Sequence, residues 1–217
     1  TTEDISLLNV QANKHIPELH AALVAAHNDR YPSSPASMDS EYSVDEHSHR
    51  FAAWAAARAA SVIGCRFTVS QGKSLMEAIS FSGVPCTADE LPPADQIDEV
   101  HRAWRERMID VAQSFGLPIT HGIAAKLINV YLKARFVSGV RAYHPHVASI
   151  HPPIDRLLLH ELAATKFGGD PRPWRKARDR GWSNFTSVEY EDVINRIRTH
   201  LNGQPLWTIE KYWRGYQ

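Results

Sequence analysis

A lysine and an aspartate, Lys126 and Asp155, stand out in the middle of the chain as residues that could do chemistry. Lys126 follows a short turn at residues 117–122 that contains a proline and a glycine. The exposed backbone amides of such a turn, together with the N-terminus of the next helix, can hold a phosphate group. The stretch therefore combines a candidate phosphate site with an amine and a carboxylate.

Two predicted helices must position these side chains. A first helix is expected to end at Gly116, because glycine tolerates the positive φ that is common after a helix and Pro118 cannot continue one. A second helix is expected to run through Lys126 to about Arg135, which completes a helix-hairpin-helix outline. Two prolines then force an extended backbone, and Asp155 precedes an apolar run, so it is a candidate N-cap.

These residues resemble the helix-hairpin-helix DNA glycosylases, and within them the 8-oxoguanine glycosylase branch that carries a lysine. That branch has a hairpin of the form Leu-Pro-x-x-x-Gly-x-x-x-Lys, followed by a Val/Ile-Asp segment at the start of a later helix. The chain matches these two parts at Leu117, Pro118, Gly122 and Lys126 and at Pro153-Ile154-Asp155. It departs in its hairpin, Leu-Pro-Ile-Thr-His-Gly, which is less rich in glycine, and in a longer insert between the two parts.

The resemblance implies an enzyme that breaks the N-glycosidic bond of a base in DNA. Asp155 would act as a base or stabilise the positive charge on the sugar, and Lys126 would attack C1′ to form a Schiff base, after which an AP-lyase step could nick the strand. The amine must be neutral to attack, so its pKa must be lowered. The nucleotide must also be flipped out of the duplex. The implied substrate is an oxidised purine in DNA repair, or a hypermodified phage base in anti-phage defence.

Both residues have an ordinary structural alternative. Asp155 could only cap its helix, and Lys126 could be a solvated surface lysine. Two other functions therefore stay open, a non-catalytic helix-hairpin-helix DNA-binding module and a helical scaffold protein. A nuclease is disfavoured, because no acidic cluster suited to holding metal ions is apparent.

Further DNA contacts are predicted around this pair. In the hairpin, the phosphate-contact candidates are Thr120, His121 and Gly122. A loop at residues 166–181 carries six basic and two acidic residues, and it supplies Arg175 and Lys176. The candidates for a base pocket are Trp54, Arg58, Asn129, Val130 and Trp182. Helix packing, a core position or a solvated loop is the alternative for each of them.

Composition limits the partners and the surroundings. Basic and acidic residues are equal at 24 each, so binding to DNA must depend on a local patch. Two cysteines, Cys65 and Cys86, are too few for a disulfide scaffold or an iron–sulfur cluster, and they favour a cytoplasmic or nucleoid setting. No apolar run reaches the length of a membrane span, and the N-terminus lacks a signal-peptide core, so no membrane partner is expected. No protein partner is implied.

Three histidines, His144, His146 and His151, raise the possibility of a metal site. Their spacing is a weak signal, and no cysteine or acidic residue completes a set of ligands nearby. Neither a metal nor a cofactor is therefore expected.

Strand signals are scarce, so the sequence predicts an all-α, helix-hairpin-helix DNA glycosylase-like helical fold. One domain is expected over residues 1–217, with the option of two lobes and a cleft between them. The hairpin occupies residues 115–136 and the aspartate segment residues 151–165. Other helices are expected at residues 3–28, 50–63, 69–82, 97–115 and 188–201, before an amphipathic tail. Loops are expected at residues 29–48 and 166–181.

Overall fold

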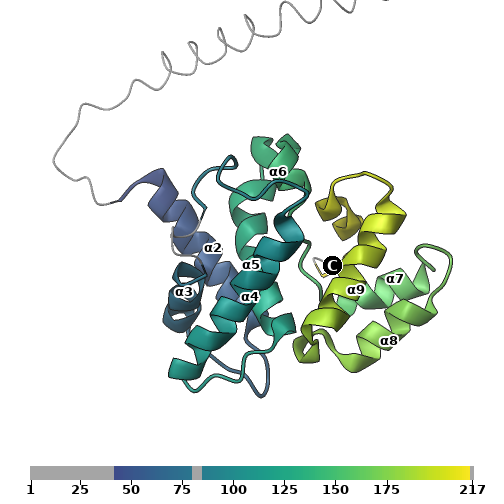
Figure 1. The fold of residues 1–217 in the computed structure, drawn as a ribbon, viewed down its shortest axis with the longest axis horizontal. Coiled ribbons are helices and arrows are strands. Elements are labelled where there is room, and N and C mark those ends of the chain that lie inside the picture. The colour runs from purple at the N-terminus through teal and green to yellow at the C-terminus, as the bar shows by residue number, and fades with distance from the viewer. Residues whose placement is uncertain (1–41, 80–84, 216–217) are drawn as a thin grey trace, which may run out of the picture. The chain divides into compact units, whose positions relative to one another are not determined.

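A computed structural model describes residues 42–79 and 85–215, and within these ranges the regular elements are helices without a strand (Figure 1). The all-α class is thereby confirmed for this part of the chain. The part from Val44 onward forms one compact unit. The helices predicted at residues 3–28 lie outside the described residues, and the single domain predicted over residues 1–217 extends into that segment.

The helices follow one another along the chain as α2 (Val44–Ala60), α3 (Val69–Glu77), α4 (Ile97–Ser114), α5 (His121–Leu132), α6 (Pro145–Ala148), α7 (Arg156–Ala164), α8 (Arg172–Arg180) and α9 (Ser187–Leu201). Other helical turns lie between these helices and after α9. They are a π-helical turn η1 (Lys133–Val137) and the 3-10 helices η2 (Val140–Tyr143), η3 (Trp182–Asn184) and η4 (Leu206–Tyr212).

Several predicted boundaries were wrong. Helix α2 begins at Val44, inside the segment predicted as a loop, because two acidic residues in its first turn favour a helix N-terminus. It ends at Ala60 rather than at Gly64, which instead has φ +92° in a turn closed by the bridge between Val62 and Cys65. Helix α3 ends at Glu77, so it is shorter than predicted.

The basic segment predicted as a loop is largely helix α8. Its prolines and glycines favoured a loop interpretation, but a proline in the first turn of a helix costs little, because the first amides have no partner within the helix. The arginines, lysine and alanine that follow are good helix formers. Trp174 anchors α8, since its ring is buried and its Nε1 donates to the Phe167 carbonyl at 2.8 Å.

Within the described ranges, two hydrophobic cores hold the helices together. The first lies among α2, α3, α4 and α5, where α2 contributes the fully buried alanines Ala52, Ala56 and Ala60. These small side chains let α2 pack closely against α5 and α3. The second core lies among α7, α8, α9 and η4, and it includes Leu158, Tyr190 and Ile197. Figure 1 shows the first group in blue and teal beside the second in green and yellow.

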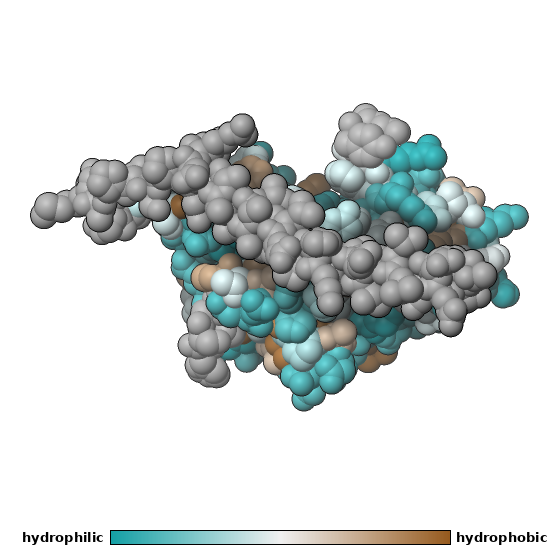
Figure 2. Space-filling model, turned by 90° about the horizontal axis from the view of Figure 1, so that it is seen from above, coloured by the Kyte–Doolittle hydropathy of each residue, from teal (hydrophilic) through white to brown (hydrophobic). Residues whose placement is uncertain are grey.

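Helix α5 takes part in both cores. Ala124 lies in the first core, and the next residue, Ala125, lies in the second. Lys126 follows these two alanines, so its side chain leaves the helix where the two groups of helices meet. On the face seen in Figure 2, the visible described residues are mostly hydrophilic, with small hydrophobic patches between them.

The turn before α5 has the predicted outline. Gly116 lies directly after α4 with φ +65°, and Thr120 is the N-cap of α5, where its hydroxyl accepts from the Ile123 amide at 3.2 Å. The same hydroxyl donates to the Ser183 carbonyl at 2.6 Å. The hairpin is therefore tied to η3, which lies more than sixty residues later in the chain.

Gly122 is required by a close contact within the protein. Its amide donates to the Phe185 carbonyl at 3.2 Å, and a Cβ at this position would lie 1.8 Å from the carbonyl oxygen of Trp182. The sequence predicted that the missing side chain lets the backbone approach a ligand. In the structure, the space is filled by the backbone of residues 182–185.

We expect Gly122→Ala to lower the free energy of unfolding by about 3 kcal/mol, because the backbone of η3 must shift to admit a methyl group. Gly116→Ala is the matched control. Its φ is also strained for alanine, but a Cβ there meets nothing within 4 Å, so the expected cost is about 1 kcal/mol. Urea unfolding measures both values. Equal losses would show that the contact between Gly122 and Trp182 is not rigid.

Candidate active site

Lys126 and Asp155 meet in the structure. The Nζ atom of Lys126, on α5, donates to Oδ2 of Asp155, the N-cap of α7, at 3.1 Å. The Lys126 side chain is only 8% exposed and that of Asp155 is 19% exposed. Lys126 is therefore not a solvated surface lysine, and the two predicted residues form a largely buried ion pair.

Asp155 is a helix cap and also a partner of two other side chains. Its Oδ1 accepts from the Leu158 amide at 2.9 Å, which is the predicted capping bond. Its Oδ2 accepts from Nε1 of Trp213 at 2.9 Å as well as from Lys126. The capping bond fixes one oxygen, so the other oxygen is held toward the lysine and the indole.

Burial lowers the pKa of Lys126 below its usual value, because desolvation disfavours the ammonium form. The Asp155 carboxylate opposes this shift by attracting the ammonium group, but desolvation is the larger effect. The result is an amine that loses its proton more easily than an exposed lysine does. This is the direction that nucleophilic chemistry requires.

A cavity of about 450 Å³ opens beside the pair. Its lining comes from α2, α5, η1, η3 and the C-terminal segment, and it includes Phe51, Ala55, Ala59, Val130, Pro153, Trp182 and Trp213. The Trp182 ring centroid lies 5.7 Å from Nζ of Lys126. The two alanines of α2 leave space where larger side chains would fill it, and the indoles supply flat apolar walls.

A second ion pair lies at the same cavity. Lys133, seven residues after Lys126 and the first residue of η1, pairs with Glu210 of η4, and its Nζ lies 5.4 Å from the Trp213 ring centroid. Burial raises the pKa of Glu210 above its usual value, although Lys133 opposes the shift. This pair connects the C-terminal segment to α5 and holds that wall of the cavity in place.

The structure brings together only part of the predicted base pocket. Val130 and Trp182 line the cavity, but Asn129 is fully buried away from it. Trp54 is half exposed beside Phe51, and Arg58 lines a separate groove. The sequence did not single out the lining residues Phe51, Lys133, Ser138, Glu210 and Trp213. Lys133 could have been found, because it lies seven residues after Lys126 and thus on the same helix face.

A buried polar network explains the position of Asn129. Its Nδ2 donates to the Pro152 carbonyl at 3.0 Å and to the Tyr190 hydroxyl at 2.9 Å, while its Oδ1 accepts from Nε2 of His101 at 2.8 Å. Burial lowers the pKa of His101 well below its usual value, so the imidazole is neutral. Asn129 therefore holds the backbone that leads to Asp155 in place. It does not line the cavity itself.

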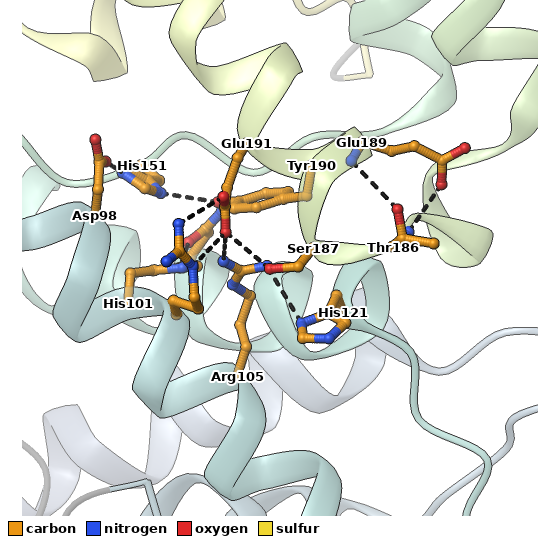
Figure 3. Close-up of polar contacts among 12 residues, drawn as sticks. Asp98, His101, Arg105, His121, His151, Thr186, Ser187, Glu189, Tyr190 and Glu191 are labelled. Atoms are coloured by element: carbon orange, nitrogen blue, oxygen red, sulfur yellow. Dashed lines mark hydrogen bonds and ion pairs between the residues drawn. The ribbon is translucent and has the colours of Figure 1, made fainter.

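The network continues through His151, as Figure 3 shows. Because the Tyr190 oxygen already accepts from Asn129, its hydroxyl donates to Nδ1 of His151 at 3.0 Å. The Nε2–H of His151 then donates to the Asp98 carboxylate at 2.8 Å. Burial keeps the pKa of His151 below its usual value. These contacts bind the segment before Asp155 to α4 and α9.

Next to this network, the Arg105 guanidinium lies 4.7 Å from the Tyr190 ring centroid and binds Glu191. Its carboxylate accepts from Arg105 at 2.7 Å and from Arg102 at 2.7 and 2.8 Å (Figure 3 shows Arg105). The Arg102 guanidinium, followed by Arg105, lowers the pKa of Glu191 to about 2. Because Arg105 is on α4 and Glu191 on α9, the pair connects the two groups of helices.

The lowered pKa of Glu191 predicts a pH dependence of stability. A carboxylate with a depressed folded pKa contributes stability above its unfolded value of 4.5, and this contribution is lost as the pH falls toward about 2. We expect Glu191→Gln to lower the melting temperature at neutral pH. The variant should also show a smaller loss of stability between pH 4.5 and about pH 2 than the wild type. Glu106→Gln is the control. Glu106 is exposed on α4, the helix that carries Arg105, and its replacement should leave the pH dependence of stability unchanged. Parallel wild-type and Glu191→Gln profiles would contradict this assignment.

The hairpin has few amides free for a phosphate. The Gly122 amide is bound to Phe185, and the Ile123 amide is bound to the hydroxyl of Thr120. His121 accepts at Nδ1 from Arg105 at 3.3 Å, and burial lowers its pKa. The three predicted hairpin contacts are therefore largely engaged within the protein.

Helix α8 presents Arg175 and Lys176 to solvent, but the charge around them is mostly compensated. Of the surrounding basic residues, three are paired with carboxylates: Arg172 with Asp170, Arg178 with Asp179, and Arg180 with Glu189. The six basic residues of this segment thus form a much weaker positive patch than their number suggests.

The three histidines that raised the possibility of a metal site, His144, His146 and His151, do not form one group in the structure. His144 contacts Asp89 and His146, whereas His151 lies in the buried network. In the ranges that the structure describes, no group of three or more histidines, cysteines or carboxylates is placed to hold a metal ion. In the same ranges, no helix has both the length and the apolar character needed to cross a membrane.

A comparison of the chain with protein-family models, curated proteins and solved structures found no match.

Proposed function

We propose that the protein is a DNA glycosylase that receives a flipped base in the cavity beside Lys126 and Asp155 and excises it. The observation that carries the proposal is the buried pair itself, with 3.1 Å between Nζ and Oδ2 at the wall of a tryptophan-lined cavity. A buried ion pair is a weak source of stability, because apolar residues of similar volume often do as well. A chemical role explains its presence better.

The carboxylate supports the first step. When the bond between C1′ and the base nitrogen breaks, its electron pair leaves with the base, and positive charge develops on the sugar. Asp155 is held by Leu158 and Trp213, so it needs no reorganisation to face that charge. Such fixed electrostatic groups commonly contribute the largest part of a rate enhancement.

The amine supports the second step. Neutral Lys126 forms a bond to C1′, the sugar ring opens, and the product is a Schiff base between Nζ and C1′. β-Elimination from this intermediate would then remove a proton from C2′, form a double bond between C2′ and C3′, and break the bond between C3′ and its oxygen, so that the phosphate on the 3′ side leaves with that electron pair. The lowered pKa of Lys126 favours the neutral amine that this sequence needs.

The cavity supports a base-sized substrate. Its volume of about 450 Å³ falls within the usual range for small-ligand sites, roughly 300 to 1,000 Å³. Trp182 and Trp213 offer surfaces on which a flipped base can stack. The substrates we propose are an oxidised purine or a bulky hypermodified base, in DNA repair or in defence against phage.

The test uses the full chain and duplexes that each carry one oxidised, deaminated, alkylated or glucosylated base. Base release is scored as alkali-labile sites, and borohydride is added to parallel reactions to trap a Schiff base. Release from one substrate with a trapped adduct supports a glycosylase with lyase activity, and release without an adduct supports a monofunctional enzyme. Binding without release from any duplex would favour the non-catalytic DNA-binding module.

A further inference from the structure

A groove of about 740 Å³ lies at the C-terminal end of α2, along the turn at residues 62–65 and the start of α3. It is distinct from the cavity at Lys126, and of its lining residues the sequence pointed only to Arg58, as a candidate for the base pocket. Its lining includes Arg58, Ser61, Ile63, Arg66 and Ser183. Arg58 and Arg66 are both exposed.

The charge of this groove is uncompensated. Among the described residues that line it, Arg58 and Arg66 are the charged ones, and no carboxylate lies among these side chains. In the part of the chain that the structure describes, neither arginine forms an ion pair. The two guanidinium groups can therefore bind an anionic ligand without first breaking an internal contact.

A second groove, of about 660 Å³ between α8 and α9, provides a contrast. Three of its arginines are paired with carboxylates that line the same groove: Arg172 with Asp170, Arg180 with Glu189, and Arg196 with Asp192. An anionic ligand there would compete with three internal carboxylates. The groove beside α2 is thus the better anion site, although it contains fewer basic residues.

The groove beside α2 adjoins the cavity at Lys126. Helix α2 contributes Ala57 and Arg58 to the groove and Ala55 and Ala59 to the cavity. In η3, Ser183 lines the groove, and its neighbour Trp182 lines the cavity. A strand whose base enters the cavity would therefore have its backbone within reach of the groove.

We propose that this groove binds the phosphodiester backbone of the DNA strand next to the flipped nucleotide, through Arg58 and Arg66. The inference rests on the proposed function, because it takes DNA as the substrate. Ile63 is 90% exposed at the tip of the turn and offers an apolar surface for the sugar carbons. In this proposal, the groove supplies phosphate contacts in place of the amides of Gly122 and Ile123, which are already bonded within the protein.

The test measures DNA affinity by fluorescence anisotropy over a series of salt concentrations. The variants are Arg58→Gln, Arg66→Gln and the double variant, with Arg172→Gln and Arg196→Gln of the second groove as matched controls. Removing one arginine that binds a phosphate should reduce the slope of log K against log salt by about 1, so the double variant should show a reduction of about 2. The control variants should keep the wild-type slope, and thermal melting checks that each variant is folded.

The outcomes separate the groove from the proposed function. If Arg58→Gln and Arg66→Gln keep the wild-type slope while the enzyme still releases a base, the groove assignment is overturned and the glycosylase stands. Reduced slopes only in the Arg172→Gln and Arg196→Gln variants would place the backbone on α8 and α9 instead. Tighter binding to an RNA duplex of the same sequence would overturn the DNA assignment. Absence of binding to any DNA would overturn both proposals.

Discussion

Lys126→Gln is expected to abolish borohydride trapping on a duplex that carries a preformed abasic site. Such a site presents C1′ as an aldehyde, so a Schiff base can form without prior base excision, with loss of one water molecule. Lys126 is the amine at the cavity beside Asp155, and burial lowers its pKa. The measurement is the fraction of DNA that migrates as a covalent complex after reduction. Asp155 keeps its bonds from Leu158 and Trp213, so the variant should remain folded.

Lys133→Gln is the matched control, because Lys133 directly follows α5, at the start of η1, and lines the same cavity. Its amine is paired with Glu210, and trapping should persist in this variant. Trapping that survives in Lys126→Gln but disappears in Lys133→Gln would transfer the nucleophile to Lys133.

The trapping rate of the wild type should also rise with pH and level off below 10.5, the usual pKa of a lysine. The protonated amine cannot attack, and burial moves its loss of the proton to lower pH. A profile that still rises at and above that value would show that the reacting amine is an exposed one.

Asp155→Asn is expected to lower the rate of base release by about 100-fold or more, which is the usual loss when one charge-stabilising group is removed. Asparagine caps helices as well as aspartate does, so the fold should be kept. Trapping on the preformed abasic site should continue, because that reaction does not pass through the cationic sugar. Single-turnover kinetics on the substrate identified in the base panel gives the first rate, and reduction on abasic DNA gives the second.

The same variant should shift the trapping profile to lower pH. Asp155 opposes the effect of burial on the pKa of Lys126 more strongly than Glu210 does, so its replacement removes the larger part of that opposition. Glu210→Gln is the comparison, because it removes a carboxylate that raises the pKa of Lys126 less than Asp155 does, so it should shift the trapping profile in the same direction by a smaller amount. If Glu210→Gln stops base release and Asp155→Asn does not, Glu210 is the carboxylate that acts on the sugar.

The sequence predicted most elements whose signals are local. Helix α4 was predicted to within one residue of its observed end, because its apolar spacing and Gly116 lie within a single segment. The N-caps Thr120 and Asp155 bond to amides three residues later in the chain, so their contacts are also local. The start of α2 and the helix α8 were missed, because prolines, serines and glycines resemble a loop until packing selects a helix.

The sequence by itself therefore determined the helical class, the hairpin outline and the two residues, Lys126 and Asp155, on which the proposed chemistry depends. Only the tertiary structure decided that Lys126 and Asp155, which are 29 residues apart in the chain, form a pair. It also decided that Trp213, 58 residues after Asp155, donates to the same carboxylate, and that burial lowers the pKa of Lys126. It also decided which arginines keep an uncompensated charge. The physical reason is that capping and helix periodicity act within a few residues, whereas desolvation and ion pairing depend on which distant segments pack together.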